Sequence, residues 1–526
     1  MTHPPLLEIA PQDVHQVVGR HLLVDALDFV FDLEKSRGAW LFDSRSGRNL
    51  LDFMTFIASS PIGYNHPKVK DGDFQQRLLK VAQVKPSLSD AFTVEYAGFL
   101  ETFARVAMPT YLPHAFFIEG GTLAVENTLK VAMDYKVRQN WRGGSDPAKQ
   151  RGQQIVHFKE AFHGRSGYCL SLTNTDPAKT DLFPKFPWPR LENPKLTFPP
   201  TEESQRDVAA AEQRSLEQLR KAFEDCGDDI AGILIEPIQG EGGDNHFRPE
   251  FIQALKSIAD SMNCFFIVDE VQTGVALTGK FWAHEHYGVE PDALAFGKKT
   301  QTCGCLVGTK VDREPDNVFK TKSRINSTWG GNLTDMVRFQ RFLEIIEEDR
   351  LVENAAAVGE HLLSGLRGLS GEFPDYVANC RGRGLMIAFD TVAEKRKTLL
   401  AKCYELGMIA LPSGVRSVRF HPPPHLDPFR GRSGPRHSAT RTSISPRRSR
   451  QMIENEAAIF IANDAMAEII KAKSAKGKLV RVAEEGYYEV RLTLNGKQHT
   501  AYLPVSTTVV VAATPEGEFA SIAVER

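Results

Sequence analysis

Long apolar runs, a basic N-terminal segment and a strong net charge are all missing from this sequence of 526 residues. No apolar run approaches the ~20 residues that a membrane-spanning helix requires. The N-terminus, MTHPPLLEIAPQDVHQ, has no basic stretch followed by an apolar one, so we expect no signal peptide. A formal net charge of -2 gives no reason to expect a nucleic-acid or membrane partner. These absences favour a cytoplasmic protein.

Cysteine is also sparse, with seven residues scattered along the chain. Cys303 and Cys305 are the only close pair, and no second pair exists that could complete a metal site. We therefore expect no bound metal, and we expect the reduced, buried thiols that are usual in a cytoplasmic protein.

The chain is too long for one ordinary hydrophobic core, so two or more domains are expected. Residues 39–53 predict a β-hairpin that turns at Gly47. From about Pro86 onward, strands and helices alternate, which is typical of an α/β fold. The clearest strands are predicted at 115–118, 154–158, 231–235, 265–268 and 293–296, and the clearest helices at 91–106, 123–138, 203–225, 249–262, 336–350, 353–369 and 396–406.

Two of these strands end in residues that carry charge. The run 265–268 is followed by Asp269, and the run 293–296 is followed by Gly297, Lys298 and Lys299. In an open α/β sheet, ligands bind beyond the carboxyl ends of the strands, so Asp269 and one of the two lysines, Lys298 or Lys299, are expected to face one crevice. Pyridoxal phosphate requires such a pair, because a lysine forms its Schiff base and an aspartate pairs with its pyridinium nitrogen. The alternative is a surface lysine and an unrelated strand-end aspartate.

A possible phosphate site precedes this pair. The strand 115–118, the turn Glu119-Gly120-Gly121-Thr122 and the helix from Leu123 form a strand, a glycine turn and a helix N-terminus. Free N–H groups and the helix dipole favour an anion at such a terminus. The motif alone is a weak signal that often serves packing, but beside an Asp/Lys pair it predicts a phosphate cup.

Three further side chains follow strand ends. Phe162 could stack on a flat cofactor ring, and Arg165 could bind a substrate carboxylate through two hydrogen bonds. The alternatives are a core phenylalanine and a surface ion pair. The glycines around Glu241 predict a mobile carboxylate that could act as a switch near a substrate arginine; the alternative is a glycine loop with a solvated glutamate.

Seven motifs together resemble the class III (ω-) aminotransferases of pyridoxal-phosphate fold type I. The motifs are EGGTLAVENTLK (119–130), AFHGRSGYCLSLTNT (161–175), IEPIQGEGGDNHFRPEF (235–251), IVDEVQTG (267–274), AFGKKTQ (295–301), NSTWGGNLTDMVR (326–338) and RGRGLM (381–386). The resemblance covers about residues 13–421. HGRSGY, QGEGGDNHFRPEF and NSTWGGNLTD resemble family members that act on lysine more than those that act on ornithine or GABA.

The resemblance implies an α/β fold with a large domain around a mostly parallel sheet and a smaller α+β domain. Residues 86–334 would form the large, cofactor-binding domain, and residues 1–85 and 335–423 the small one. The resemblance also implies a homodimer.

Cofactor contacts follow from the same resemblance. Lys298 would form the Schiff base, with Lys299 as the weaker candidate, Asp269 would hold the pyridine nitrogen, and Gln272 would reach the phenolic oxygen. Phe162 would stack on the ring. The phosphate would be bound by Gly121 and Thr122, and by Thr328 from the partner subunit.

For the substrates, the resemblance implies that Arg165 and Arg419 bind the carboxylates of L-lysine and 2-oxoglutarate. Glu241 would screen an arginine when lysine presents its ε-amine, and would withdraw when 2-oxoglutarate needs that arginine. Glu236 and Asn326 would either contact the substrate or support the residues that contact it.

The implied reaction is transfer of the ε-amino group of L-lysine to 2-oxoglutarate by a ping-pong mechanism. Its products would be L-glutamate and 2-aminoadipate 6-semialdehyde, which cyclises to piperideine-6-carboxylate. Lys298 would move the proton as general acid and base. One alternative is an ω-aminotransferase that acts on ornithine or another diamine. Another is a cofactor-binding protein whose altered C-terminus impairs catalysis.

The resemblance ends at residue 423. Residues 424–451 are rich in Arg, Pro and Ser with a single acid, a composition that predicts disorder. An out-of-frame translation of helix code or a basic linker would explain them, and we favour the former. Residues 452–526 predict a small α+β or β-meander module of unknown function, with a helix at 453–473, strands at 478–483, 487–494, 499–505 and 508–513, and a hairpin turn at Asn495-Gly496.

Overall fold

The computed structural model of the chain describes residues 9–25, 27–84 and 90–424, together with five strands between residues 475 and 522. The expected junction at 424–451 and helix at 453–473 therefore lie outside the described residues, apart from Pro424. Those two expectations stay predictions.

A seven-stranded sheet with the strand order β3-β9-β8-β7-β6-β4-β5 forms the centre of the chain. Neighbours from β8 to β5 pair in parallel, whereas β9 runs antiparallel to both β8 and β3. The expected mostly parallel sheet is thus confirmed. The bounds are β3 His114–Ile118, β4 Gln154–Phe158, β5 Arg190–Leu191, β6 Ile230–Ile235, β7 Phe265–Asp269, β8 Ala293–Phe296 and β9 Cys303–Val307.

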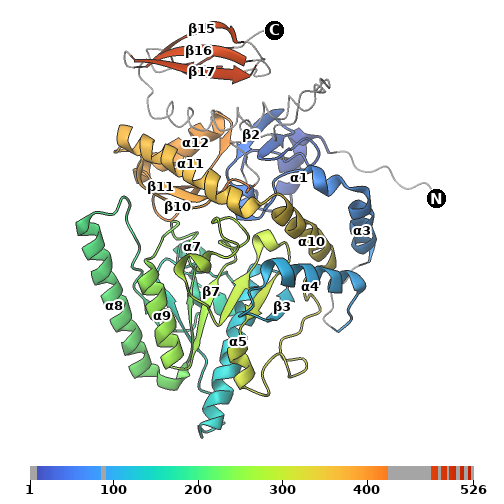
Figure 1. Ribbon diagram of the computed structural model, residues 1–526, viewed down its shortest axis with the longest axis vertical. Helices are drawn as coiled ribbons and strands as arrows, with labels where there is room; N and C mark the ends of the chain where they lie inside the picture. The colour runs from blue at the N-terminus through green and yellow to red at the C-terminus, as the bar shows by residue number, and fades with distance from the viewer. Residues whose placement is uncertain are drawn as a thin grey trace, which may run out of the picture.

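Helices cover both faces of this sheet (Figure 1). Successive residues of a strand point to opposite faces: Phe265 of β7 packs in one core with Leu129 of α5, and Phe266 packs in the other with Leu255 of α9. A strand buried on both faces explains the continuous apolar runs in the sequence. The helices between residues 72 and 348 have these bounds: α3 Gly72–Gln83, α4 Val94–Ala107, α5 Gly121–Arg142, α6 Gly167–Leu172, α7 Pro177–Thr180, α8 Glu202–Cys226, α9 Pro249–Ser261 and α10 Leu333–Glu348.

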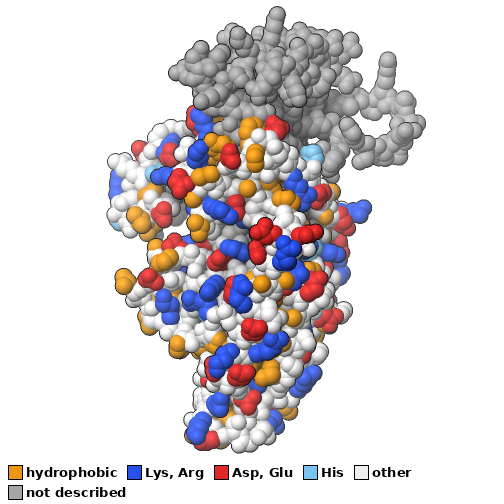
Figure 2. Space-filling view, turned by 90° about the vertical axis from the view of Figure 1, so that its left-hand side faces the viewer, with side chains coloured by type: hydrophobic (Ala, Val, Ile, Leu, Met, Phe, Trp, Pro, Cys, Tyr) orange, Lys and Arg blue, Asp and Glu red, His pale blue; other side chains and the backbone are white. Residues whose placement is uncertain are grey.

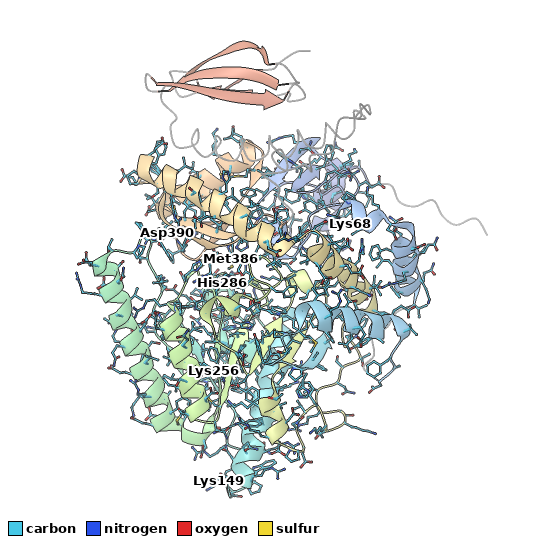
Figure 3. The ribbon with its side chains drawn as sticks, in the orientation of Figure 1. Lys68, Lys149, Lys256, His286, Met386 and Asp390 are labelled. Carbon is cyan, nitrogen blue, oxygen red and sulfur yellow. The ribbon has the colours of Figure 1, made fainter. Side chains whose placement is uncertain are left out.

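Two smaller sheets, β1-β2-β12 and β10-β11-β14-β13, lie with α11 and α12 at one end of the central sheet (Figure 1). Figure 3 labels Met386 and Asp390 in this layer. Phe53, Leu363, Ile387 and Phe420 share one core, so segments from both ends of the sequence pack together. The remaining bounds are α1 Val14–Gly19, β1 Trp40–Asp43, β2 Arg48–Asp52, α2 Thr55–Ala58, α11 Leu351–Glu372, β10 Ala378–Arg383, β11 Met386–Asp390, α12 Ala393–Glu405, β12 Met408–Ile409, β13 Leu411–Ser413 and β14 Ser417–Phe420.

The division into a large domain (86–334) and a small domain (1–85 with 335–423) stays a prediction. The shared core just described fits it. Helix α10, which spans the proposed boundary at 335, packs on α3 and α4.

The C-terminal strands β15 Ala475–Ala483, β16 Tyr487–Leu494 and β17 Lys497–Pro504 pair in antiparallel order. Leu494 pairs with Lys497, which is the register of a two-residue connection at the expected turn. Strands β18 Val510–Ala513 and β19 Phe519–Ile522 form a separate antiparallel pair, of which β19 is not predicted by the sequence.

Within the described part of the chain, no helix has both the length and the apolar character that crossing a membrane requires. Among those same residues, no cluster of three or more His, Cys, Asp or Glu side chains could hold a metal ion. Acidic and basic side chains are interspersed over the face shown in Figure 2.

Candidate active site

The carboxyl ends of β7 and β8 bring Asp269 and Lys298 to one site, as the strand pattern predicts. Burial lowers the pKa of Lys298 most, and Arg419 also lowers it. Asp269, Glu236 and Asp244 oppose these two effects, and the net result is a pKa of about 8. These four charged groups therefore lie close enough to act on the Lys298 amine. Lys298 has a φ of 53°, in the left-handed region that a lysine rarely adopts. Such strain is concentrated at functional sites.

The neighbouring Lys299 has a different environment. Its side chain is buried, and its Nζ donates hydrogen bonds to the carbonyl oxygens of Gln272 at 2.6 Å and of Ala58 at 3.2 Å. Ala58 ends α2, in which all four residues have positive φ. Lys299 thus links an unusual left-handed turn to the loop after β7 by hydrogen bonds. Both of these contacts of its amine are with backbone carbonyl oxygens.

Asp269 contacts a histidine that the sequence analysis does not single out. Nδ1 of His163 lies 2.8 Å from Oδ2 of Asp269, and both side chains are buried. Oδ1 of Asp269 accepts a hydrogen bond from the backbone N–H of Val271 at 3.0 Å. His163 follows Phe162 within the motif at 161–175, and this position was the sequence signal that could have identified it. The two contacts fix the orientation of the Asp269 carboxylate.

Glu236 links two loops of the site. Its Oε1 accepts the N–H of Phe162 at 2.9 Å, and its Oε2 accepts the N–H of Gly240 at 3.0 Å. Burial and nearby Asp269 raise the pKa of Glu236 to about 7, although His163 opposes them. The structure thus places Glu236 as a support for the Phe162 and Gly240 backbones.

The strand, glycine turn and helix N-terminus that predict a phosphate cup are present at the start of α5. Gly121 begins this helix of 22 residues after Gly120, whose φ of 97° suits glycine. Thr122 follows, and Gly164 packs against it so closely that a Cβ on Gly164 would overlap the Thr122 hydroxyl. The backbone N–H groups of this first turn lack intrahelical partners and are suited to an anion.

Gln272 offers a second test of the cofactor's fit. Its Nε2 is buried and has no hydrogen-bond partner among the described residues. A buried donor without a partner is costly, unless a ligand satisfies it. The phenolic oxygen of pyridoxal phosphate is an acceptor of the required kind, so the residues present fit this cofactor.

The charged side chains on the substrate side are arranged differently from the expectation. Glu241 forms an ion pair with Lys179 of α7, a residue that the sequence analysis does not name. Arg419 is buried, donates to the carbonyl oxygen of Gly240 and lies 3.2 Å from Asp244. Arg165 is exposed and forms no hydrogen bond or ion pair with another described residue.

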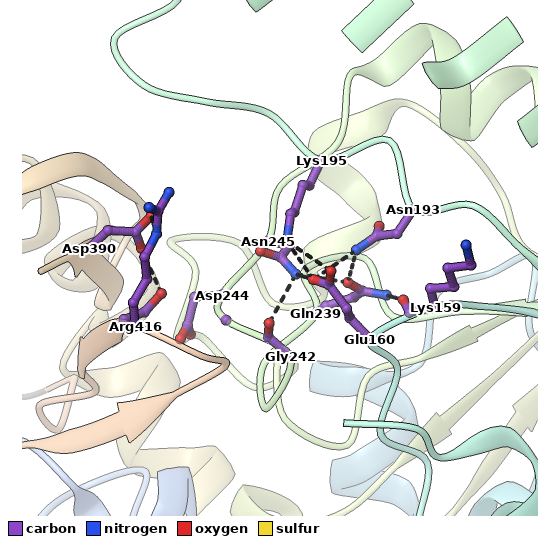
Figure 4. Close-up of polar contacts among 12 residues, drawn as sticks. Lys159, Glu160, Asn193, Lys195, Gln239, Gly242, Asp244, Asn245, Asp390 and Arg416 are labelled. Carbon is purple, nitrogen blue, oxygen red and sulfur yellow. Dashed lines mark hydrogen bonds and ion pairs between the residues drawn. The ribbon is translucent and has the colours of Figure 1, made fainter. Parts of the chain in front are cut away.

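Two carbonyl oxygens in the loop that carries Glu241 accept side-chain hydrogen bonds, and Figure 4 shows the one at Gly242. Asn245 donates to the carbonyl oxygen of Gly242 at 3.2 Å, and Arg381 donates to that of Gly243. A Cβ on Gly242 would overlap the carbonyl oxygen of Glu160. These glycines allow close packing of the loop backbone, and the expected mobility of Glu241 stays a prediction.

Asn326 and Thr328 are exposed. Neither forms a hydrogen bond or ion pair with a described residue of the same chain. The structure does not connect them to Lys298 or Asp269 within one subunit, and the expected contact of Thr328 across a subunit interface stays a prediction.

Comparisons with known proteins agree with this geometry. The sequence profile described as "Aminotransferase class-III" matches residues 24–426. The chain is 51% identical over 416 residues to the L-lysine-epsilon aminotransferase of Mycobacterium tuberculosis, which covers 78% of this chain and 91% of that protein. It is 47% identical over 414 residues to the enzyme of the same name from Streptomyces clavuligerus, with 78% and 90% covered.

A solved structure, described as lysine aminotransferase from M. tuberculosis in the internal aldimine form, resembles the fold with a TM-score of 0.79. The match has 47% sequence identity and covers 88% of this chain and 100% of the other. The similarity therefore extends over the described site as a whole.

Proposed function

Because the chain belongs to the class-III aminotransferase family, we propose that it transfers the ε-amino group of L-lysine to 2-oxoglutarate. The observation that carries the reaction type is the convergence of Lys298 and Asp269 at the ends of two neighbouring parallel strands. The observation that carries the substrate is 51% identity with an L-lysine-epsilon aminotransferase over most of both chains.

The cofactor is pyridoxal 5'-phosphate, which, when bound, withdraws electrons from the carbon that bears the transferred amine. Asp269, fixed by His163, would hold the pyridine nitrogen in its protonated form. The orphaned Nε2 of Gln272 would donate to the phenolic oxygen, and Phe162 would cover one ring face. Gly121 and Thr122 would bind the phosphate.

Lys298 would carry the proton during transfer. Because burial and Arg419 lower its pKa to about 8, a sizeable fraction of its amines is neutral near physiological pH. A group with such a pKa both accepts and returns a proton efficiently. A ping-pong order follows, because the amino group is stored on the enzyme between the two substrates.

Two arginines would bind the substrate carboxylates. Arg165 is exposed and available to the single carboxylate of lysine, while Arg419 would serve the second carboxylate that 2-oxoglutarate adds. Glu241 would screen Arg419 when lysine is bound. Asn326 would lie near the substrate, and Glu236 would hold the two loops in place.

We further propose a cytoplasmic homodimer in which Thr328 completes the phosphate site of the partner subunit. The exposure of Thr328 and Asn326, together with exposed Trp329 in the same loop, supports a role for this loop at a subunit interface.

The direct test follows the absorbance of the cofactor in the purified protein. Addition of L-lysine alone should convert the spectrum to that of the amino form, and 2-oxoglutarate should then restore the first spectrum with release of glutamate. A faster conversion by ornithine would overturn the lysine assignment, while absence of conversion by any amine would support an impaired cofactor-binding protein.

A further inference from the structure

Lys179 has no role in the function proposed above, yet it contacts two residues of the proposed site. Its Nζ pairs with Glu241 and lies 5.9 Å from the centroid of the Phe162 ring. The short helix α7 fixes its position, because Asp176 caps that helix by accepting the N–H of Ala178 at 3.0 Å. The side chains of Lys179 and Glu241 are 25% and 30% exposed, so a substrate can reach both.

Two arginines lie near the Lys179 amine that pairs with Glu241. Burial lowers the pKa of Lys179, and Arg165 and Arg419 lower it further, which shows that the positive charges lie near one another. Asp244, the carboxylate next to Arg419, is already shared with His421 at 3.2 Å and Ser413 at 2.6 Å. Glu241 is therefore the acid available to respond to a change in ligand charge.

Glu241 can exchange partners by side-chain rotation. Arg419 donates to the carbonyl oxygen of Gly240, which places its guanidinium beside the residue that precedes Glu241. Because Asn245 and Arg381 donate hydrogen bonds to the carbonyl oxygens of Gly242 and Gly243, the loop backbone stays in place. A rotation about side-chain bonds costs far less than a loop movement.

We propose that Lys179 is a specificity-determining residue, which holds Glu241 away from Arg419 and so leaves Arg419 open to the second carboxylate of a dicarboxylic 2-oxo acid. When the substrate is a diamino acid with one carboxylate, Glu241 leaves Lys179 and neutralises Arg419. Lys179 thus sets the balance between the two substrates. The inference rests on the proposed function for the identity of these substrates.

Binding of glutarate, an unreactive dicarboxylate, to the cofactor-loaded protein tests the proposal by calorimetry. Lys179→Met should weaken glutarate binding about fivefold or more. The Lys179–Glu241 pair is partly buried, so its coupling to glutarate binding should exceed the energy of a fully exposed ion pair. Lys179→Arg should retain the affinity. Lys185→Met is the matched control, because Lys185 lies in the same segment, is 33% exposed and pairs only weakly with Asp181 at 3.6 Å; its affinity should equal that of the parent.

A double-mutant cycle separates this role from a direct attraction between Lys179 and glutarate. Glu241→Gln should restore most of the affinity in the Lys179→Met background, but should change the parent by less than about twofold. Equal effects of Glu241→Gln in both backgrounds, or full affinity of Lys179→Met, would overturn the proposal.

A second readout concerns the two halves of the reaction. The Lys179→Met variant should retain the parent's rate with L-lysine and show a raised KM for 2-oxoglutarate. A parallel loss with both substrates would indicate a structural role and overturn the proposal. If the parent itself fails to respond to L-lysine while the glutarate cycle behaves as stated, the substrate assignment is wrong and the role of Lys179 stands.

Discussion

At the scale of single residues, the two adjacent lysines of the site differ in what their amines contact. Lys298 faces Asp269 and other charged groups, whereas Lys299 donates to two backbone carbonyl oxygens. The positive φ of Lys298 turns the chain between them. In the sequence, both lysines follow the same predicted strand and cannot be told apart by position. Only the family resemblance favoured Lys298 as the residue that forms the Schiff base.

The structural role of Lys299 predicts a loss of stability without loss of cofactor attachment. Lys299→Met leaves the carbonyl groups of Ala58 and Gln272 buried without this donor, which should lower the free energy of unfolding by about 2 kcal/mol or more. Chemical denaturation measures this loss. Lys149→Met is the control, since Lys149 is exposed and lies far from the site (Figure 3); an equal effect of both variants would contradict the assigned role.

The pKa of Lys298 predicts opposite shifts for two substitutions. Arg419 lowers this pKa below the ordinary lysine value, so Arg419→Met should raise it from about 8; Asp269 raises it, so Asp269→Asn should lower it. We expect shifts of about one pH unit. The pH dependence of the rate at which cofactor-free protein takes up pyridoxal phosphate reports the neutral amine. Shifts of the same sign in both variants would contradict the described charge arrangement.

At the scale of elements, the glycines near Glu241 predict a contrast with glycines on an open surface. A Cβ at Gly242 would overlap a backbone oxygen, while a Cβ at Gly368 in α11 would meet nothing within 4 Å. Gly242→Ala should therefore lower the free energy of unfolding by about 2 kcal/mol or more. Gly368→Ala should raise it by about 0.5–1 kcal/mol, because alanine favours a helix. Thermal unfolding compares the two, and equal tolerance at both positions would contradict the packed loop.

Most elements of the central sheet were predictable from their apolar runs, because strands buried on both faces leave a continuous pattern. β4 and β8 have the predicted bounds. β9 was missed: it begins Cys303-Gly304-Cys305, and a glycine inside a short strand weakens the pattern. Outside the central sheet, the chain between β10 and β11 turns at Gly384, whose φ is 53°.

The site was predictable where a side chain follows a strand end, since topology then dictates its position. Asp269 and the pair Lys298-Lys299 belong to this class, whereas the choice of Lys298 within the pair required the resemblance. The contacts of Lys179 and His163 were not predictable, because α7 and the loop after β4 are placed by tertiary packing across the site. The pairing of Glu241 with Lys179, in place of an arginine, likewise depends on contacts between distant segments.

At the scale of the whole molecule, the proposed dimer predicts complementation between two inactive variants. Lys298→Ala removes the amine, and Thr328→Ala should weaken phosphate binding. If each site combines Lys298 of one subunit with Thr328 of its partner, mixed dimers regain one intact site. Refolding an equal mixture should then restore about a quarter of the parent's sites. Measured aminotransferase activity equal to the mean of the separate variants would contradict the shared site.

The account depends most directly on Lys298 as the residue that binds the cofactor. Reduction of the cofactor-loaded protein with borohydride, followed by peptide mass spectrometry, identifies the lysine that carries it. The account predicts a single modified residue, Lys298. Modification at Lys299 or at any other lysine, with Lys298 unmodified, would contradict it.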